Sequence, residues 1–324
     1  MPIRLPSCLH MLAGVAIAVA AGAAQAQAYP SKPIRWVVPY TPAGAYDSIA
    51  RITGEKLAAL LGQQVVIDNR PGADGVVGLE QVAKAAPDGY TIVIGGLPTH
   101  AINPSLFRKL PYNHITDFAP VSMLARAPVV LVVNNQLPVK SLKEFVAYAQ
   151  ARPGKLSYGS SGAGMRLSMQ MLISATGIDM VPVPYKGSAP AVSDLIGGQI
   201  PAMIDSVPAE LGFIRGGRVR PLAVGSAKRT PVLPDVPTFT EAGVPVESTL
   251  WYALFTPAGV PKPVIDRLNG AMVKILAMDD VVKKLADTGI DASSSTPEEL
   301  RDYVKSETAK WAKAVKEAKM EMIN

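Results

Sequence analysis

The sequence predicts an α/β fold of two lobes, each a largely parallel β-sheet flanked by helices. Short β-branched runs alternate with amphipathic stretches along most of the chain, and this alternation is typical of βα units. Most of the runs are apolar throughout, as strands covered on both faces should be. The chain has 324 residues, a length that favours two hydrophobic cores over one.

The first 28 residues have the features of a secretory signal peptide. Arg4 precedes an apolar run over residues 11–21, and small residues follow up to Ala28, where we expect cleavage. The run is shorter than the roughly 20 residues that a membrane-spanning helix needs. The only cysteine, Cys8, lies in this segment. The exported chain is therefore expected to be soluble and free of disulfides, with its stability coming from burial.

Nine runs are predicted to be strands. They are rich in Val, Ile and aromatic residues, and most are followed by Gly, Pro, Asn or Asp, which are typical of turns. In chain order they cover residues 34–38, 65–68, 90–94, 129–134, 156–158, 180–183, 202–204, 222–224 and 251–255.

The helices between these strands have readable ends. Residues 47–61 place apolar side chains along one broad face, and Gly62 ends the pattern. Residues 141–144 read Ser-Leu-Lys-Glu, a capping box in which the Ser oxygen accepts a free N–H and the Glu reaches back to the N–H of the capping residue. Residues 296–299 form a second box, with proline at the first helical position, and open a C-terminal helix.

No linker of low complexity marks the boundary between the lobes, so we place it where the chain is able to cross over. The best candidates for the two crossings are residues 118–127 and the proline-rich residues 231–245. Lobe 1 is then discontinuous, formed by residues 29–125 plus 240–324, and lobe 2 is the inserted segment 126–239.

The charge balance argues against a nucleic-acid partner. The formal net charge is +6, and removal of Arg4 with the signal leaves +5. The basic residues are scattered, and no block of like charge appears. An anionic small molecule is compatible with this balance.

Two turns are candidate binding sites, because ligands bind beyond the carboxyl ends of strands where helix starts converge. Free N–H groups at a helix start favour an anion such as a carboxylate. The alternative is that both are ordinary turns whose glycines relieve backbone strain. The candidate residues are Thr41, Ala43, Gly44, Ala45, Tyr46 and Asp47 in the first turn, and Ser160, Ser161, Gly162, Ala163, Gly164 and Met165 in the second.

Three further residues follow predicted strands. Thr99 or His100 is placed to donate to a ligand, although a surface-loop histidine is the simpler interpretation of His100. Asp205 ends another apolar run, where its carboxylate would orient a water, accept from a ligand hydroxyl, or cap the next helix. The sequence does not decide among these roles.

Catalytic and metal-binding motifs are missing from the exported chain. It has two histidines and no cysteine, so we expect no metal site. Residues 159–163 fail the G-x-S-x-G nucleophile pattern at Ala163, and no phosphate-binding glycine loop appears. We therefore expect no enzyme activity and no cofactor.

The chain resembles the Bug family (Bordetella uptake gene), the extracytoplasmic solute receptors of tripartite tricarboxylate transporters. The resemblance lies in the order and spacing of several short stretches along the whole exported length. These are Tyr-Pro-Ser-Lys-Pro-Ile-Arg at 29–35, Asn-Arg-Pro-Gly-Ala at 69–73, Ala-Pro-Asp-Gly-Tyr-Thr at 86–91, Pro-Tyr-Lys-Gly at 184–187, Leu-Ala-Val at 222–224 and Leu-Pro-Asp-Val-Pro-Thr at 233–238.

This resemblance implies a monomeric, two-lobed periplasmic-binding-protein-like receptor that closes on a carboxylate solute in the periplasm. The two turns would hold the solute largely through backbone groups and waters, and the 184–187 motif adds Tyr185 to the candidate residues. Receptors of this family deliver their solute to a membrane permease made of a large and a small subunit.

Departures from the family pattern bear on the choice of ligand. Tyr46 replaces a small residue, and Ala163 and Met165 stand where polar residues are common. We therefore expect a less polar pocket, suited to an aromatic or otherwise apolar carboxylate. Two alternatives to a transport receptor remain open, namely a ligand-sensing receptor for a signalling partner and a secreted hydrolase.

Overall fold

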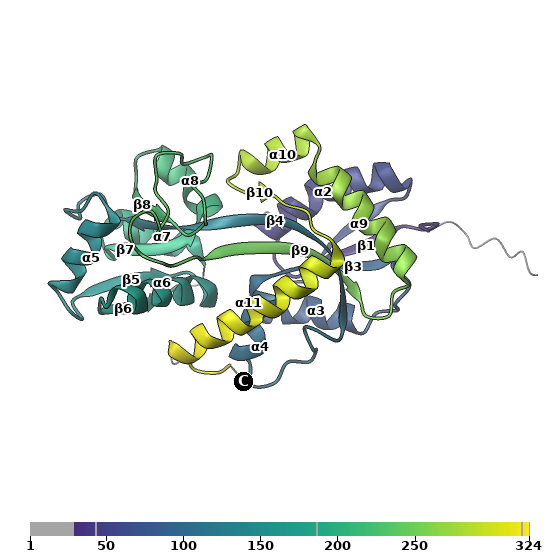
Figure 1. Cartoon of the computed structure of the whole chain (residues 1–324), viewed down its shortest axis with the longest axis horizontal. Helices are drawn as coiled ribbons and strands as arrows, with labels where there is room; N and C mark the ends of the chain where they lie inside the picture. The colour runs from purple at the N-terminus through teal and green to yellow at the C-terminus, as the bar shows by residue number, and fades with distance from the viewer. Residues whose placement is uncertain (1–28, 43, 186, 319, 324) are drawn as a thin grey trace, which may run out of the picture.

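Two lobes lie along the long axis of the molecule, and two long strands run side by side along the same axis where the lobes join (Figure 1). The computed structural model describes residues 29–42, 44–185, 187–318 and 320–323. The predicted signal peptide, residues 1–28, lies outside the described residues.

The sheet of lobe 1 combines parallel and antiparallel pairs. β1 is parallel to β2 and β3, whereas β9 runs antiparallel to β3 and β4. The short β10 pairs with β4 at the edge. In sheet order the strands are β2 (Val65–Asn69), β1 (Ile34–Val38), β3 (Thr91–Gly96), β9 (Thr249–Pro257), β4 (Phe118–Val133) and β10 (Asp291–Ala292).

The sheet of lobe 2 continues from the second half of β4. β7 and β8 pair with β4 in antiparallel fashion, while β5 is parallel to β6 and β7. The strands added in this lobe are β5 (Leu156–Ser160), β6 (Met180–Pro184), β7 (Ala202–Ser206) and β8 (Arg220–Val224).

The two connecting strands account for the difference from the expected, largely parallel sheets. Every antiparallel pair within the described residues involves β4 or β9. The predicted crossing at 118–127 and the predicted strand at 129–134 are one continuous strand, β4. A strand that passes from one lobe to the other and a strand that returns must run in opposite directions, and the sequence did not indicate that both crossings are β-structure.

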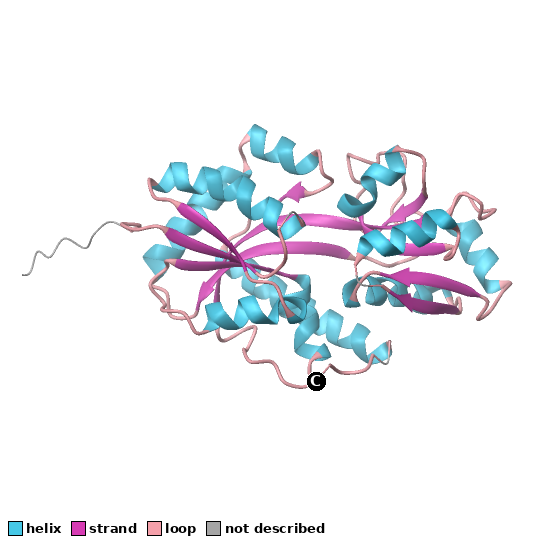
Figure 2. Ribbon diagram, turned by 180° about the vertical axis from the view of Figure 1, so that it is seen from behind, coloured by secondary structure: helices cyan, strands magenta, loops and turns pink. Residues whose placement is uncertain are grey.

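Helices pack on both faces of the strands (Figure 2). Two short segments, the 3₁₀ turn η1 (Ala73–Gly75) and the π-helical turn η2 (Pro98–Ile102), belong to lobe 1. Within the described residues, no helix is both long and apolar enough to cross a membrane. Lobe 1 has α2 (Ala45–Leu61), α3 (Val76–Ala83), α4 (Asn103–Leu106), α9 (Lys262–Leu276), α10 (Asp279–Ala286) and α11 (Pro297–Glu317). Lobe 2 has α5 (Leu142–Gln150), α6 (Ala163–Thr176), α7 (Ser188–Gly197) and α8 (Val207–Arg215).

The predicted helix ends are present, with one correction. Gly62 ends α2 in the left-handed conformation, and the 296–299 capping box is complete at the start of α11. At α5, Ser141 accepts the N–H of Glu144 as expected, but the Glu144 carboxylate accepts from the N–H of Lys140 instead of the capping residue.

Apolar clusters fill both sides of each sheet. One cluster in lobe 1 contains the buried side chains of Trp251 and Trp311, and it also includes Leu167 from α6 of lobe 2. Leu167 is fully buried there. Burial of a leucine side chain contributes about 1.5–3 kcal/mol, so this contact stabilises the arrangement in which the lobes touch.

We propose a boundary between the lobes that lies slightly later than the expected one at both crossings. β4 changes partners from β9 to β7 and β8 between Pro128 and Val129. The segment 231–245 does not cross over, because Phe239 and Val244 pack in the core of lobe 2. We therefore propose that lobe 2 spans residues 129–248, in place of 126–239.

Candidate functional site

A cavity of about 230 Å³ lies between the lobes. Both lobes contribute to its wall, and β9 passes along it. The lining residues from lobe 1 are Tyr40, Tyr46, Asp74, Leu97, Pro98, Ile102, Asn103, Leu250 and Tyr252. Those from lobe 2 are Ser161, Gly162, Ala163, Gly164, Met165, Ser188 and Asp205.

Three tyrosine rings form much of the lobe 1 wall. The Tyr46 ring lies 4.4 Å from that of Tyr40 and 4.7 Å from that of Tyr252, measured between centroids. The second pair meets edge to face, at 77°, an arrangement that aromatic quadrupoles favour. Burial is the main cause that raises the pKa of all three phenols above the ordinary value. The rings therefore present neutral hydroxyls to the cavity at neutral pH.

A glycine on the neighbouring strand fixes the position of Tyr46. A Cβ atom added at Gly96 would lie 2.5 Å from the Tyr46 hydroxyl oxygen and would collide with the Trp251 carbonyl oxygen. No other residue fits between these groups without displacing one of them. β3 therefore needs glycine here so that the ring can approach the sheet.

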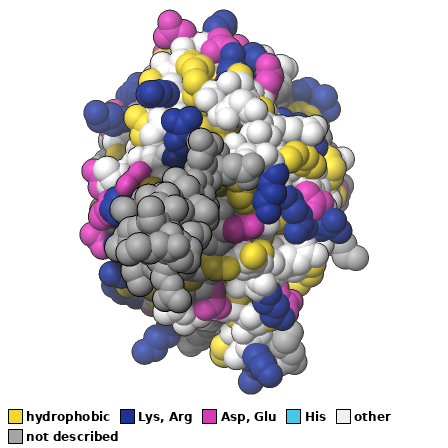
Figure 3. Space-filling model, turned by 90° about the vertical axis from the view of Figure 1, so that its right-hand side faces the viewer, with side chains coloured by type: hydrophobic (Ala, Val, Ile, Leu, Met, Phe, Trp, Pro, Cys, Tyr) yellow, Lys and Arg dark blue, Asp and Glu magenta, His cyan; other side chains and the backbone are white. Residues whose placement is uncertain are grey.

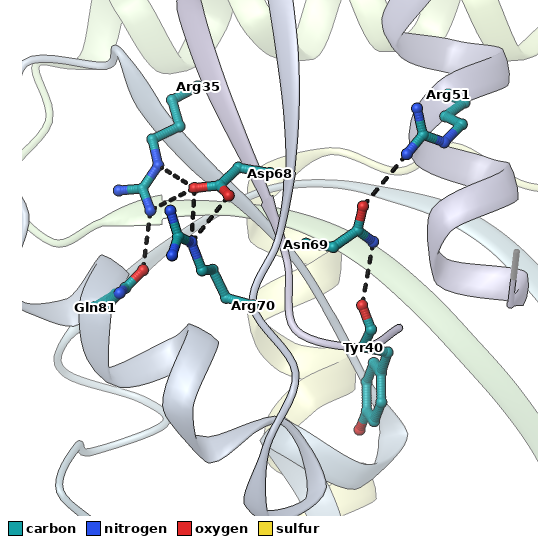
Figure 4. A network of polar contacts seen from close by, with 7 residues as sticks. All are labelled: Arg35, Tyr40, Arg51, Asp68, Asn69, Arg70 and Gln81. Carbon is teal, nitrogen blue, oxygen red and sulfur yellow. Dashed lines mark hydrogen bonds and ion pairs between the residues drawn. The ribbon is translucent and has the colours of Figure 1, made fainter. Parts of the chain in front are cut away.

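Polar contacts behind the first turn hold the start of α2 in place. The Asn69 side-chain amide donates to the Tyr40 carbonyl oxygen at 3.1 Å and to the Asp47 carboxylate at 3.0 Å. Arg51 pairs with Asp47 at 2.8 Å and donates to Asn69 at 3.3 Å. Figure 4 shows the Arg51–Asn69–Tyr40 chain beside a second network around Asp68. The Asp47 side chain is buried, with 3% exposed, and its hydrogen bond from Asn69 joins α2 to the end of β2.

The lobe 2 wall is built from the starts of helices. α6 begins at Ala163 and α7 at Ser188, and neither has a side-chain cap. The first α6 hydrogen bond across the cap runs from the Arg166 N–H to the Gly162 carbonyl oxygen. The N–H groups of residues 163–165 thus have no partner within the helix, and they form the positive end of the helix dipole. This end of the cavity favours a negatively charged group.

Asp205 is the buried acid of the same wall. It lies at the end of β7, is 2% exposed, and accepts the Ser206 N–H at 2.7 Å through Oδ1. Its Oδ2 atom has no hydrogen-bond partner among the described residues. Burial raises the pKa of the carboxyl, and the neighbouring Ser188 and Ser161 hydroxyls oppose that shift without reaching hydrogen-bonding geometry at Oδ2.

A second buried acid lies behind Asp205. Glu210, in the first turns of α8, is fully buried, and neither carboxyl oxygen has a hydrogen-bond partner within the described chain. Burial, together with the charge of Asp205, raises the pKa of Glu210 from 4.5 to about 8. Glu210 is therefore neutral at pH 7, and the pair carries at most one negative charge.

The lobes touch beside the cavity. The hydroxyls of Ser168 on α6 and Ser248 at the second crossing lie 2.7 Å apart. A Cβ atom on Gly164 would be in ordinary van der Waals contact with Ile102 of η2, at 3.5 Å. Together with the buried Leu167, these contacts describe a closed arrangement of the two lobes.

The structure brings together seven of the sequence-predicted site residues. Tyr46, Asp205 and the second turn from Ser161 to Met165 line the cavity. Ser160 and Tyr185 line an adjoining, wider hollow of about 690 Å³, which also includes Arg166. The Ser160 hydroxyl donates to the Gly162 carbonyl oxygen at 3.3 Å, and that of Tyr185 to Asp194 at 2.8 Å.

Four other predicted residues are not among the described lining residues. Thr41, Gly44, Ala45 and Asp47 lie in or behind the first turn, outside the lining set. Ala43 lies outside the described residues.

Thr99 and His100 are buried in η2, so the interpretation of His100 as a surface-loop residue is wrong. The Gly96 N–H donates to the Thr99 hydroxyl at 3.0 Å, and His100 Nδ1 lies 2.9 Å from that hydroxyl. The His100 ring stacks on Phe255 at 4.0 Å. Burial lowers the pKa of His100 to about 3, so the ring is a neutral core residue.

Sequence reasoning missed most of the lobe 1 wall. Tyr40 adjoins the predicted turn, and Ser188 directly follows the 184–187 motif, so both were within reach of the motifs. Asn103 and Tyr252 carry no such signal. They are brought to the cavity by η2 and by the long strand β9. The missed residues are Tyr40, Asp74, Leu97, Pro98, Ile102, Asn103, Ser188, Leu250 and Tyr252.

Charge near the cavity is limited to a few side chains. Among the described lining residues, the only charged types are Asp74 and Asp205. No group of three or more His, Cys, Asp or Glu side chains in the described ranges is suited to hold a metal ion. On the face shown in Figure 3, Lys and Arg side chains are scattered among acidic and uncharged ones.

Comparison with known sequences identifies relatives along nearly the whole chain. Residues 49–320 match the family described as tripartite tricarboxylate transporter family receptor. The UPF0065 protein in the tcbD-tcbE intergenic region of a Pseudomonas species is 42% identical over 318 residues, covering 96% of this chain and 94% of that protein. Protein BugT of Bordetella pertussis is 38% identical over 310 residues, covering 94% and 95% respectively.

Solved structures agree with the fold. An adipate-bound protein of R. palustris is 38% identical and superposes with a TM-score of 0.82, covering 91% of this chain and 100% of that one. MatC from Rhodopseudomonas palustris with bound malate is 34% identical with a TM-score of 0.76, covering 89% and 100%. These superpositions confirm the predicted α/β, two-lobed periplasmic-binding-protein-like fold.

Proposed function

Because the chain belongs to the tripartite tricarboxylate transporter receptor family, as its sequence motifs predict, we propose that it captures a small carboxylate solute between its lobes. The observation that carries the proposal is the cavity of about 230 Å³ walled by both lobes. Two solved relatives of the same fold hold adipate and malate. A solute that contacts both walls favours the closed form, because closure completes its contacts.

The solute carboxylate binds at the start of α6. The N–H groups of residues 163–165 have no side-chain cap to satisfy them, and the Ser161 hydroxyl lies on the same wall. Backbone donors at a helix start hold an anion without needing a lysine or arginine. Arg166 lines the adjoining hollow, so its charge adds long-range attraction at the entrance.

The remainder of the solute is apolar or aromatic. Tyr46, Ala163 and Met165, the departures from the family pattern, all line the cavity, together with Tyr252. Rings and a thioether suit an aromatic or aliphatic body better than a second charged end. We therefore expect an aromatic monocarboxylate to bind more tightly than citrate or malate.

Transport is the process that this binding serves. We propose that residues 1–28 export the chain to the periplasm, that a monomer delivers the solute to the permease subunits, and that no reaction is catalysed. The Ser161 hydroxyl shares its cavity with no described histidine, so it lacks the usual general base of a hydrolase. A ligand-sensing receptor would use the same cavity, and a pull-down against membrane extracts distinguishes a permease from a sensor.

A thermal-shift panel followed by calorimetry tests the proposal. Aromatic acids, short aliphatic diacids and citrate are compared at equal concentration, since a bound ligand raises the melting temperature by mass action. Stabilisation by at least one acid is expected, with a fall in the radius of gyration in small-angle scattering. Stabilisation by citrate alone would overturn the aromatic preference, and no binding of any acid would overturn the receptor function.

A further inference from the structure

The buried oxygen of Asp205 is the polar feature of the cavity that carboxylate capture leaves unexplained. Oδ1 is occupied by the Ser206 N–H, whereas Oδ2 has no partner among the described residues and the side chain is 2% exposed. Buried polar atoms without a partner are rare, since each costs about 1–3 kcal/mol. Asp205 is one of the residues that line the cavity, so its carboxyl group lies beside whatever occupies the cavity.

The described part of the cavity wall offers no cation for this acid. Among the described lining residues there is no Lys, Arg or His. Glu210, the second buried acid, has no hydrogen-bond partner at either carboxyl oxygen, so no hydrogen bond joins it to Asp205. The Tyr252 hydroxyl lies near enough for the Asp205 charge to raise the pKa of that phenol, but no hydrogen bond joins the two at Oδ2.

A plain carboxylate is a poor occupant of this part of the cavity. Its oxygens accept hydrogen bonds only, so they supply no donor to the unpartnered Oδ2. A hydroxyl or amino group, in contrast, donates to Oδ2 and removes the cost of the unpaired atom. The uncapped start of α6 lies on the same wall and takes the carboxylate. The carboxylate of the solute is thus recognised by hydrogen-bond donors, and its hydroxyl or amino group by an acceptor.

We infer that the solute carries a hydrogen-bond donor, a hydroxyl or an amino group, which binds Oδ2 of Asp205 while its carboxylate binds the start of α6. This inference rests on the proposed receptor function and narrows its substrate class to hydroxy- or amino-substituted carboxylic acids. Asp205 is then a specificity-determining residue that discriminates against analogues lacking the donor.

Matched pairs of acids test the inference. Calorimetry on the full-length exported protein compares benzoate with 3- and 4-hydroxybenzoate and 4-aminobenzoate, and 3-phenylpropanoate with phenyllactate. Methoxybenzoates serve as analogues of similar size that cannot donate. In at least one pair the donor-bearing acid should bind at least about tenfold more tightly, the factor that corresponds to one buried unpaired group.

Two variants assign that preference to Asp205. Asp205→Asn keeps the size of the side chain but makes it a weaker, uncharged acceptor. In the pair of acids that the wild-type protein distinguishes, the ratio of the two dissociation constants should therefore fall to about threefold or less. Binding of the donorless acid should be retained. Asp291→Asn, a change in a carboxyl of lobe 1 outside the cavity, should leave the ratio unchanged. The wild-type ratio needs no variant and remains decisive if Asp205→Asn does not fold.

Three outcomes would overturn the inference. If plain acids bind and no pair differs by more than about threefold, a water satisfies Oδ2 and the donor is not selected. If the preference persists in Asp205→Asn, the donor is received elsewhere in the cavity. If no acid of any kind binds the wild-type protein, the receptor function fails, and the inference fails with it.

Discussion

The two walls of the cavity differ in what they are made of and in what supports them. The lobe 1 wall is a set of packed rings held against the sheet, with Gly96 allowing the close approach of Tyr46. The lobe 2 wall consists of small residues at helix starts, with the buried acids Asp205 and Glu210 at and behind its surface. We therefore propose that lobe 1 selects the shape of the solute and that lobe 2 selects its polarity.

The largest expected effect concerns the acid behind the lobe 2 wall. The pKa of Glu210 is about 8, against 4.5 ordinarily, so the folded state binds the extra proton between these values and stability falls as the pH rises through this window. Glu210→Gln removes that loss. Relative to wild type, the variant should gain about 4–5 kcal/mol in unfolding free energy between pH 4 and pH 9.

Urea unfolding at a series of pH values measures this difference. Glu55→Gln, a change on the exposed face of α2, is the control and should follow the wild-type profile. If the unfolding free energies of Glu210→Gln and wild type change with pH in parallel, burial does not hold Glu210 neutral.

A pair of glycine substitutions compares the packing of the two walls. Gly96→Ala forces apart the Tyr46 hydroxyl and the Trp251 carbonyl and should cost about 1–3 kcal/mol of stability, as overpacking does. Gly162→Ala meets no atom within 4 Å, and its φ of 167° is extended backbone. It should change stability by less than about 0.5 kcal/mol. If denaturant titrations show equal losses of unfolding free energy for the two variants, the two walls do not differ in packing.

The ring of Tyr46 is the test of the lobe 1 wall in binding. Tyr46→Ser should weaken the binding of an aromatic acid by about tenfold, or 1.4 kcal/mol. It should leave the binding of a small aliphatic diacid nearly unaffected. Tyr46→Phe keeps the ring contacts and should retain most of the aromatic affinity. If calorimetry finds that Tyr46→Ser loses the same affinity for both acids, the ring supports the fold and does not determine the preference for an aromatic acid.

The smallest expected effect is on the lobe 2 wall. Ser161→Ala removes one hydroxyl beside the α6 start and should weaken any bound acid by about 1 kcal/mol, because backbone N–H groups remain. Ser306→Ala on the exposed surface of α11 is the control. A loss of more than about a hundredfold for Ser161→Ala would show that the side chain, and not the helix start, holds the carboxylate.

Local patterns in the sequence were sufficient for the strands and for most of the lobe 2 wall. All nine predicted strands lie within strands of the structure apart from an end residue or two, and the turn at 160–165 is continuous in the chain, so its position follows from one strand and one helix. Backbone recognition at a helix start depends on neighbours in sequence, which the sequence displays directly.

The lobe 1 wall was not predictable in the same way. Tyr252 comes from the middle of a strand that the sequence treated as core, and Ile102 from a π-helical turn with no distinctive motif. Asp47 had the residue type and position of a ligand contact, yet Arg51 and Asn69 engage it. Which side of a buried strand meets a cavity depends on the path of distant segments, and that information is absent from local patterns.

The passage of β4 through both lobes has a consequence for the order of folding. β3 ends at Gly96, but its partner β9 begins at Thr249, so this pairing closes a loop that contains all of lobe 2 and carries a large entropic cost. Lobe 2 is continuous, and its completion brings Pro128 and Thr249 together as a register pair. We expect lobe 2 to fold first and to present β9 to lobe 1. Until then β3 has an open edge, which is able to pair with another molecule.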